Sequence, residues 1–322
     1  LYNVTGLIWE VKSPEGSGLT QDSSFSYSWY DESLPDYSTA DNGVCDDNCD
    51  TQSYLEKLNA KKLCGFDDWR LPNKIELQDL VHYGRSQPSI DSDYFPNTKL
   101  GFYWTSNLDV DDANSAWSVG FSYGRVAGGV SAVPRLVRAV RGSPNLYAFS
   151  STLSDTEITA VNRQQLASKQ RCNEKISFTS PAERYLQDDQ GNILDKQTGL
   201  IWKRCAAGLS GEDCEQGEAE FMDWQQAYQY VATLNDESPN SNWRLPSIKE
   251  LQANNEFACE EPALNPFAFP NIPMGKVWSG TPHNKFEDSS YSYEYQNSII
   301  FYSARTVKHF VHAVKSCAAN TQ

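Results

Sequence analysis

Residues 68–78 read DWRLPNKIELQ, and residues 242–252 read NWRLPSIKELQ. The second stretch repeats the first at an offset of 174 residues, from Arg70 to Arg244. Other landmarks keep this offset: Trp104 and Trp278, Phe95-Pro96-Asn97 and Phe269-Pro270-Asn271, Ala139-Val140 and Ala313-Val314. The repeat indicates that one domain has been duplicated, and a long period seen only twice predicts tandem globular domains and not a solenoid.

Upstream of this stretch the offset between the copies changes. Thr5-Gly6-Leu7-Ile8-Trp9 returns as Thr198-Gly199-Leu200-Ile201-Trp202, which is an offset of 193 residues. The first copy therefore carries 19 extra residues, and we expect them to include the polar stretch from Asp36 to Asp50, which is typical of a surface loop. The predicted boundaries are 1–143 for the first domain, 144–171 for a linker with a short helix around Glu157 to Lys169, and 172–322 for the second domain.

The composition narrows the classes of partner. With 27 basic against 42 acidic residues the net charge is −15, which repels nucleic acid and anionic lipid headgroups. The sequence contains no apolar run close to the roughly 20 residues that a membrane span needs. A strand-like segment follows almost directly after Leu1, which is compatible with a signal or anchor further upstream.

The eight cysteines favour disulfides in an oxidising compartment over zinc, because only Cys45 and Cys49 have zinc-like spacing. Cys49 and Cys64 flank a predicted helix, Thr51 to Lys62, that would hold them too far apart to bond each other. The preferred pairs are Cys45–Cys49, Cys205–Cys214 and Cys172–Cys317. Cys64 and Cys259 are left to bridge the domains or to stay free.

The order of elements in each copy is a strand, two helices and several antiparallel strands, which predicts an α+β fold. The repeated stretch itself predicts the start of the second helix, because Asn73 with Glu76, and Ser247 with Glu250, have capping-box spacing. Asp223 is the expected N-cap of an earlier helix, whose apolar stripe is Trp224, Ala227, Tyr228, Val231 and Leu234. Further strands are expected at Gly6 to Val11, Tyr103 to Ser106, Ala116 to Phe121, Val137 to Arg141, Gly199 to Lys203, Val277 to Gly280, Ser290 to Tyr295, Ile299 to Tyr302 and His309 to Lys315.

These landmarks resemble the Lcl C-terminal domain family, a bacterial domain of unknown function. The resemblance rests on Thr-Gly-Leu-Ile-Trp, Asp-Trp-Arg-Leu-Pro-Asn-Lys-Ile-Glu-Leu, Tyr-Phe-Pro-Asn-Thr, Tyr-Trp-Thr-Ser and Val-Arg-Ala-Val-Arg, and it covers nearly all of both copies. It implies two tandem C-type lectin-like domains, each with two helices and an antiparallel sheet that joins its termini, on an exported bacterial protein. The name-giving member binds sulfated polysaccharide, an activity that the acidic charge of this chain disfavours.

The sequence leaves undecided whether calcium is a cofactor. Calcium-dependent lectins place oxygen ligands around a proline turn. In this chain Gln87-Pro88-Ser89 and Glu261-Pro262-Ala263 do not supply the third oxygen ligand in the usual way, and no Trp-Asn-Asp occurs, so an ordinary proline turn is the favoured interpretation. The remaining calcium candidates are acidic loops: Asp46, Asp47, Asn48 and Asp50, and, after the Trp104 strand, Asn107 with a metal set of Asp109, Asp111 and Asp112.

Arg70 and Arg244 are expected to be structural charges, and the recurrent tryptophans 9, 69, 104, 202, 243 and 278 are expected to lie in the core. The predicted ligand-binding residues are Asn107, Asp109, Tyr123, Arg125, Tyr291 and Tyr293, of which Tyr123, Arg125, Tyr291 and Tyr293 would form an exposed stacking surface.

No enzyme is predicted, because the sequence lacks nucleophile, phosphate-binding and metalloprotease motifs. His309 and His312 would point to opposite faces of a strand and could not share a metal. We expect a secreted or cell-surface adhesion module that binds carbohydrate, with the periplasm as the alternative location. The alternative function is protein binding in a surface assembly such as a pilus or fibre tip.

Overall fold

The structure is a computed structural model that describes residues 6–34, 38–109, 112, 114–142, 170–172, 180, 182–237 and 241–316. The chain divides into two compact units, Leu1–Leu146 and Tyr147–Gln322. The division falls within the predicted linker, of which only residues 170 and 171 are described, and the linker helix expected at Glu157 to Lys169 lies outside the described residues. Within the described residues each unit contains two α-helices and antiparallel strands, so the α+β prediction is confirmed.

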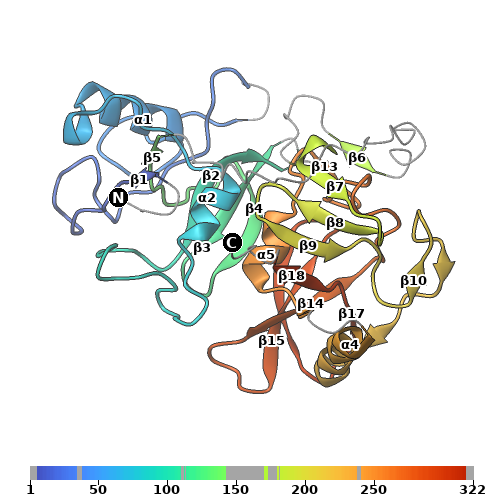
Figure 1. The fold of residues 1–322 in the computed structure, drawn as a ribbon. Helices are drawn as coiled ribbons and strands as arrows, with labels where there is room; N and C mark the ends of the chain where they lie inside the picture. The colour runs from blue at the N-terminus through green and yellow to red at the C-terminus, as the bar shows by residue number, and fades with distance from the viewer. Residues whose placement is uncertain are drawn as a thin grey trace, which may run out of the picture. The chain divides into compact units, whose positions relative to one another are not determined.

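Unit 1 holds the first set of elements (Figure 1). In chain order they are β1 (Ile8–Trp9), α1 (Thr51–Ala60), the short 3-10 helix η2 (Leu63–Gly65), α2 (Lys74–Asp79), β2 (Phe102–Leu108), β3 (Ser115–Gly120), β4 (Arg125–Val130) and β5 (Val140–Arg141). Strands β2, β3 and β4 form an antiparallel meander in which Trp104 lies opposite Ser118.

Unit 2 repeats this order with additions. Its elements are β6 (Arg171–Cys172), η4 (Ala182–Arg184), β7 (Tyr185–Gln187), β8 (Asn192–Asp195), β9 (Leu200–Lys203), β10 (Leu209–Ser210), β11 (Gln216–Gly217), β12 (Phe221–Met222), α4 (Trp224–Glu237), α5 (Ile248–Ala253), β13 (Cys259–Glu260), β14 (Lys276–Pro282), β15 (Ser289–Glu294), β16 (Ile299–Ala304), β17 (His309–Phe310) and β18 (Val314–Ser316). The main sheet has the order β12-β17-β14-β15-β16, and a second sheet has the order β18-β9-β8-β7. Figure 1 shows β7, β8 and β9 side by side.

Each unit is closed by pairing its opening strand with its last strand. In unit 1, β1 is antiparallel to β5, with Trp9 opposite Val140. In unit 2, β9 is antiparallel to β18, with Trp202 opposite Val314. The two units therefore share the same closure, at residues that correspond in the two copies of the sequence.

The repeated stretch forms the same junction in both units. Asn73 and Glu76 form a capping box at the start of α2, and Ser247 and Glu250 form one at the start of α5, as predicted. In unit 1 the guanidinium of Arg70 donates to both carboxylate oxygens of Glu76, at 2.8 and 2.7 Å, and in unit 2 Arg244 repeats these bonds with Glu250. The structural role predicted for both arginines is confirmed.

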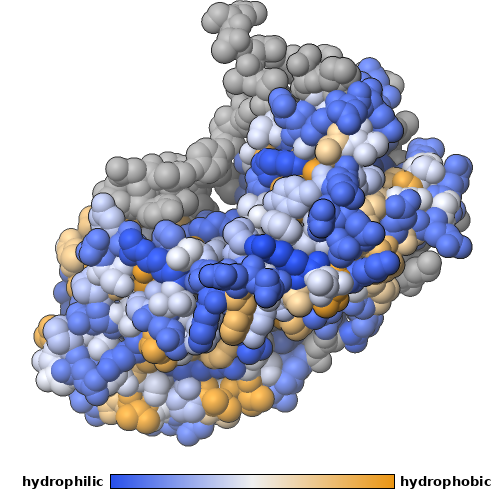
Figure 2. Space-filling model, turned by 90° about the horizontal axis from the view of Figure 1, so that it is seen from below, coloured by the Kyte–Doolittle hydropathy of each residue, from blue (hydrophilic) through white to orange (hydrophobic). Residues whose placement is uncertain are grey.

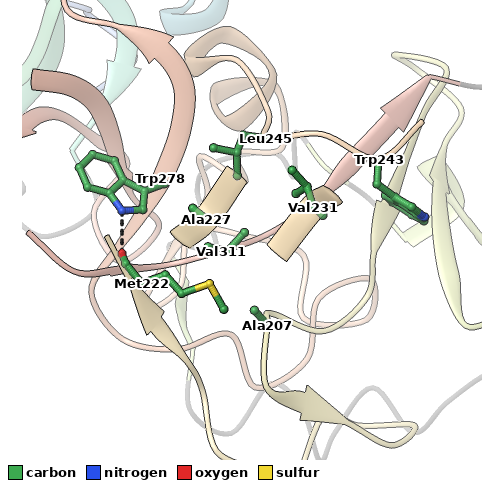
Figure 3. Packing of buried hydrophobic residues seen from close by; sticks show 9 residues of the cluster. Ala207, Met222, Ala227, Val231, Trp243, Leu245, Trp278 and Val311 are labelled. Atoms are coloured by element: carbon green, nitrogen blue, oxygen red, sulfur yellow. Dashed lines mark hydrogen bonds between the residues drawn. The ribbon is translucent and has the colours of Figure 1, made fainter. Parts of the chain in front are cut away.

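The recurrent tryptophans lie in the cores of the units, as predicted. Trp104 and Trp278 are fully buried, and the indole nitrogen of each donates to a backbone carbonyl, that of Tyr27 at 2.8 Å and that of Met222 at 2.9 Å. Figure 3 shows the second of these bonds within the core of unit 2, where Ala227 and Val231 on α4 face Trp278 and Val311. This core fixes the position of α4 against the main sheet.

Several sequence expectations are corrected by the structure. Strands β4, β6, β7, β8 and β10 to β13 were not predicted, and the strand expected at His309 to Lys315 is split into β17 and β18. The extended segment expected at Val137 to Arg141 pairs as a strand only at β5.

The disulfides Cys45–Cys49 and Cys205–Cys214 are confirmed, but Cys172 bonds Cys259 and not Cys317. The reason is that β6 and β13 are antiparallel neighbours with Cys172 directly opposite Cys259, their Cα atoms 4.1 Å apart. Cys64 is an exposed free thiol, and Cys317 lies outside the described residues.

The surface is mainly hydrophilic on the face seen in Figure 2, with hydrophobic residues in small groups. Among the described residues, no helix combines the length and the apolar character that crossing a membrane requires.

Candidate functional site

The predicted stacking surface is not a single surface. The side chains of Tyr291 and Tyr293 on β15 are 2% and 0% exposed, so the prediction that they are exposed is wrong. Burial raises the pKa of the Tyr291 hydroxyl to about 12 and raises that of Tyr293 further. The side-chain alternation of β15 does not mark an exposed face, because every residue from Ser289 to Tyr293 is buried, on both faces of the strand.

The remaining predicted residues of unit 1 lie at opposite ends of β3. Tyr123, whose hydroxyl accepts a 2.8 Å hydrogen bond from Gln87, lies in the β3–β4 turn, and the exposed Arg125 is the first residue of β4. Asn107, near the end of β2, and Asp109, in the β2–β3 connection, lie at the other end of the six-residue strand β3. A strand of this length separates its ends by roughly 20 Å, so these residues do not form one site.

The oxygens proposed as calcium ligands have other partners. The side chain of Asn107 accepts from the backbone amide of Lys74 at 2.7 Å, at the start of α2. Asp112 accepts from Ser115 and Asn114, and these bonds lower the pKa of its carboxyl. Asp111 lies outside the described residues.

Asp109 acts on a buried lysine. The side chain of Lys74 is fully buried over the ring of Trp117, with its nitrogen 3.5 Å from the ring centroid. Burial lowers the pKa of Lys74 well below its usual value, and the negative charge of Asp109 opposes this shift.

In the inserted loop, Asp50 caps α1 by accepting from Ser53. Within the described ranges, no three His, Cys, Asp or Glu side chains are grouped to hold a metal.

A better candidate lies in unit 2, at the start of α4. Trp224, Tyr228 and Arg305 line an open hollow of about 450 Å³ together with Asp223, Gln225 and Thr306. We call Trp224, Tyr228 and Arg305 the Trp224 platform. It was not predicted, because Trp224 and Tyr228 were assigned to the buried stripe of the helix.

The indole of Trp224 is held rigidly from behind. Asp223 caps α4 by accepting from the amide of Gln226 at 2.9 Å, which fixes the first turn. The indole nitrogen donates to the carbonyl of Ser279 at 3.0 Å, and the backbone amide of Trp224 donates to the carbonyl of Arg305 at 3.0 Å. The ring also packs against the core of unit 2 while part of it stays accessible.

Tyr228 and Arg305 complete the platform. The ring of Tyr228, 41% exposed one helical turn after Trp224, lies edge-on to the indole with centroids 4.5 Å apart. The guanidinium carbon of Arg305 lies 4.2 Å from the centroid of Trp224, and its Nε donates to Ser290 at 3.0 Å. No carboxylate among the described residues pairs with Arg305, so its two terminal nitrogens can donate to a ligand.

Unit 1 has the same framework, but it is covered. Trp29 corresponds to Trp224, because its indole nitrogen donates to Thr105 and its amide donates to Ser131, which are the residues equivalent to Ser279 and Arg305 at the 174-residue offset. Trp29 is only 2% exposed.

The cover comes from the inserted loop of the first copy. The amide of Thr39 donates to the carbonyl of Trp29 at 2.9 Å, and the hydroxyl of Thr39 lies 3.1 Å from that of Ser131. Asn42 donates to the carbonyl of Ala132 at 2.6 Å. The insertion was predicted from the change of offset, but its position over Trp29 was not. Its absence from unit 2 leaves Trp224 open.

The platform combines two kinds of contact. An accessible indole and phenol offer flat apolar faces and edges, and Arg305 and Asp223 offer charged hydrogen-bonding groups beside them. A ring with one apolar face and hydroxyl groups at its edge can use both.

The fold and the site define a protein of two homologous α+β units, one of which has an open aromatic platform. The chain belongs to the Lcl C-terminal domain family, whose model matches residues 2–141 and again residues 191–315. No curated protein and no solved structure matches the chain. The resemblance inferred from the sequence is therefore confirmed, and both copies are members.

Proposed function

We propose that this protein is a non-enzymatic recognition module of the bacterial surface, and that unit 2 binds carbohydrate at the Trp224 platform. Membership of the Lcl C-terminal domain family indicates a surface-associated bacterial module, and three disulfides indicate an oxidising environment, extracellular or periplasmic. Pairing of the first and last strands in each unit supports a C-type lectin-like fold.

The observation that carries the proposal is the accessible cluster of Trp224, Tyr228 and Arg305. A soluble domain usually buries a tryptophan, and this chain does bury the equivalent Trp29. A rigid indole that stays accessible lies beside a guanidinium that no carboxylate of the described residues pairs with. This arrangement suits a ligand with an apolar face and several hydroxyls, which is the chemistry of a pyranose ring. The platform uses no metal ligand, so we expect binding without calcium.

A glycan array with the full chain tests the proposal, run with calcium and with a chelator. We expect discrete hits that survive chelation. Arg305→Gln and Tyr228→Ala, which leave the core intact, should each weaken binding of a hit at least tenfold. Arg305→Gln removes hydrogen bonds from a charged group, which contribute about 1.5–3 kcal/mol each, and Tyr228→Ala removes an aromatic contact surface. Trp224→Ala should abolish it, with circular dichroism confirming the fold.

Tyr302→Ala is the matched control, because Tyr302 is an exposed aromatic of the same unit that does not line the hollow. The Tyr302→Ala variant should give the same glycan hits as the unmodified protein. An array without hits, or hits that persist in both Arg305→Gln and Trp224→Ala, would refute carbohydrate binding at this platform. Hits lost on chelation would instead favour a calcium site.

Protein binding is the second candidate function, and one observation favours it. The rings of Phe286 and Tyr302 are 43% and 51% exposed and stack at a centroid distance of 5.3 Å, with His283 packed against both. Exposed aromatic pairs are common at protein interfaces. An array without hits, together with capture of a bacterial surface protein that Phe286→Ala abolishes, would favour this function.

A further inference from the structure

A second hollow, of about 580 Å³, lies in unit 1 and is independent of the Trp224 platform. Three serines, a lysine, an aromatic ring and an arginine contribute to its wall: Ser23, Ser24, Ser26, Lys99, Phe102 and Arg135. Lys99 forms an ion pair with Glu15, so these two charges balance each other at the hollow. Among the charged residues that line the hollow, Glu15, Lys99 and Arg135, this leaves the positive charge of Arg135 without a partner of opposite charge.

Arg135 is held in one orientation by the meander of unit 1. Its Nη1 donates to the hydroxyl of Ser118, and its Nη2 donates to the carbonyl of Gly128 at 3.1 Å. The guanidinium lies over two rings, 4.9 Å from the centroid of Phe102 and 4.7 Å from that of Trp104. These contacts orient the guanidinium plane without neutralising its charge.

The strand β4 makes room for this side chain. A Cβ atom at Gly129 would lie 2.0 Å from Nη2 of Arg135, so any side chain there would force the guanidinium to move. A glycine in the interior of a strand weakens the strand, and it often marks a close approach of another group. The sequence therefore accommodates the guanidinium at a cost to the strand.

The charge of Arg135 has no counter-ion within the described part of the chain. Half-burial lowers the pKa of the guanidinium, and no acidic group offsets the shift. Its Nε has no hydrogen-bond partner among the described residues, which leaves one edge of the fork available. In a protein of net charge −15, a half-buried arginine without a carboxylate is unusual.

Unit 2 shows that the fold does not require this charge. At the 174-residue offset Arg135 becomes His309, whose ring lies 4.5 Å from that of Trp278 and whose Nε2 lies 2.8 Å from the hydroxyl of Ser303. Burial lowers the pKa of His309 to about 4, so this position is uncharged in unit 2 at neutral pH.

We propose that the hollow beside Arg135 binds a small hydroxylated carboxylate. Its carboxylate accepts hydrogen bonds from the open edge of the guanidinium, and its hydroxyls contact the serine side of the wall. Guanidinium groups recognise carboxylates through such a planar fork, and partial burial strengthens the pair relative to one in water. This site does not rest on the function proposed for unit 2.

The Nε–H signal of Arg135 in a nitrogen–proton correlation spectrum of the full chain tests the proposal, and the signal is assigned from its absence in Arg135→His. The probes are glucuronate, a carboxylate on a sugar ring, lactate, a short hydroxy acid, and neutral methyl glucoside. We expect a saturable shift with at least one carboxylate and none with the glucoside. The arm that responds distinguishes a sugar acid from a short hydroxy acid.

Arg135→His is the informative variant, because unit 2 carries histidine at this position and folds around it. Its affinity for the responding carboxylate, measured by calorimetry, should fall at least tenfold at pH 7.5, while Arg305→Gln leaves it unchanged. No saturable shift with either carboxylate, an equal shift with methyl glucoside, or unchanged affinity in Arg135→His would overturn the proposal. Each of these results is independent of glycan binding at the Trp224 platform.

Discussion

Arg70 and Arg244 carry the same ion pair in two slightly different surroundings. The carboxylate of Glu76 is 5% exposed and that of Glu250 is 21% exposed. Arg70 also donates to the carbonyl of Gly142 at 2.8 Å, next to the strand that closes unit 1. The pair in unit 1 is therefore the more buried, and it is linked to the closure of the unit.

We expect Arg70→Ala to lower the unfolding free energy of unit 1 by about 2 kcal/mol, since it leaves a nearly buried carboxylate without its partner. Arg244→Ala should cost unit 2 about 1 kcal/mol, because solvent reaches Glu250 more easily. Denaturant unfolding of each variant measures the difference. Equal losses, or a larger loss for Arg244→Ala, would contradict this account, and glycan hits should survive in both variants.

The sequence predicted those residues whose role depends only on their neighbours along the chain. The capping boxes and the N-cap at Asp223 follow from residues three apart, and both arginines follow from their neighbours. The Trp224 platform could not be predicted in this way. Whether Trp224 is covered depends on a loop that the second copy lacks, and an amphipathic pattern cannot distinguish a buried aromatic from one at the edge of the stripe.

Among the elements, strand β4 shows why part of the sheet was missed. Its centre contains Gly128 and Gly129, and glycine disfavours strands. Both glycines have a packing reason, because a Cβ atom at Gly128 would lie 2.2 Å from the carboxylate of Asp109 and one at Gly129 would meet Arg135. Local propensity therefore argues against a strand that tertiary contacts require. The pairing of Cys172 with Cys259 was missed for a related reason, since it depends on which strands are neighbours.

The three disulfides close chain segments of very different length, with sequence separations of 4, 9 and 87 residues. In the chain-entropy account a longer loop gives more stabilisation, about 4 to 5 kcal/mol for Cys172–Cys259 and about 2 to 3 kcal/mol for Cys205–Cys214. Replacing both Cys172 and Cys259 with serine should therefore lower the thermal transition temperature of unit 2 more than replacing both Cys205 and Cys214. Equal shifts of the two double variants in calorimetry would argue against the loop-length explanation.

For the whole molecule, the two units should respond differently to acid. Burial lowers the pKa of His309 and of His312 in unit 2 to about 4, below the unfolded value of about 6.5. At the equivalent positions unit 1 carries arginines, Arg135 and Arg138, so it lacks these two histidines.

Because the two histidines are neutral when folded, the unfolded state binds more protons between pH 6.5 and 4. Their stabilising contribution is complete above pH 6.5 and is lost as the pH falls towards 4, by about 3 kcal/mol for the fully buried His312. Chemical denaturation from pH 7.5 to 4 should show unit 2 losing more stability than unit 1. A parallel decline of the two units would count against neutral buried histidines, and His312→Gln should flatten the difference.

The inserted loop of unit 1 leaves and rejoins the scaffold at almost the same point. The side chain of Thr51 accepts a hydrogen bond from the amide of Tyr30 and donates one to its carbonyl, both at 2.9 Å. A segment anchored this way can be lost or acquired by deletion or insertion without moving the strands and helices on either side. After the duplication, one insertion in the first copy or one deletion in the second would have been enough to produce the present difference. Trp29 is buried in unit 1, and Trp224 in unit 2 is accessible to a ligand.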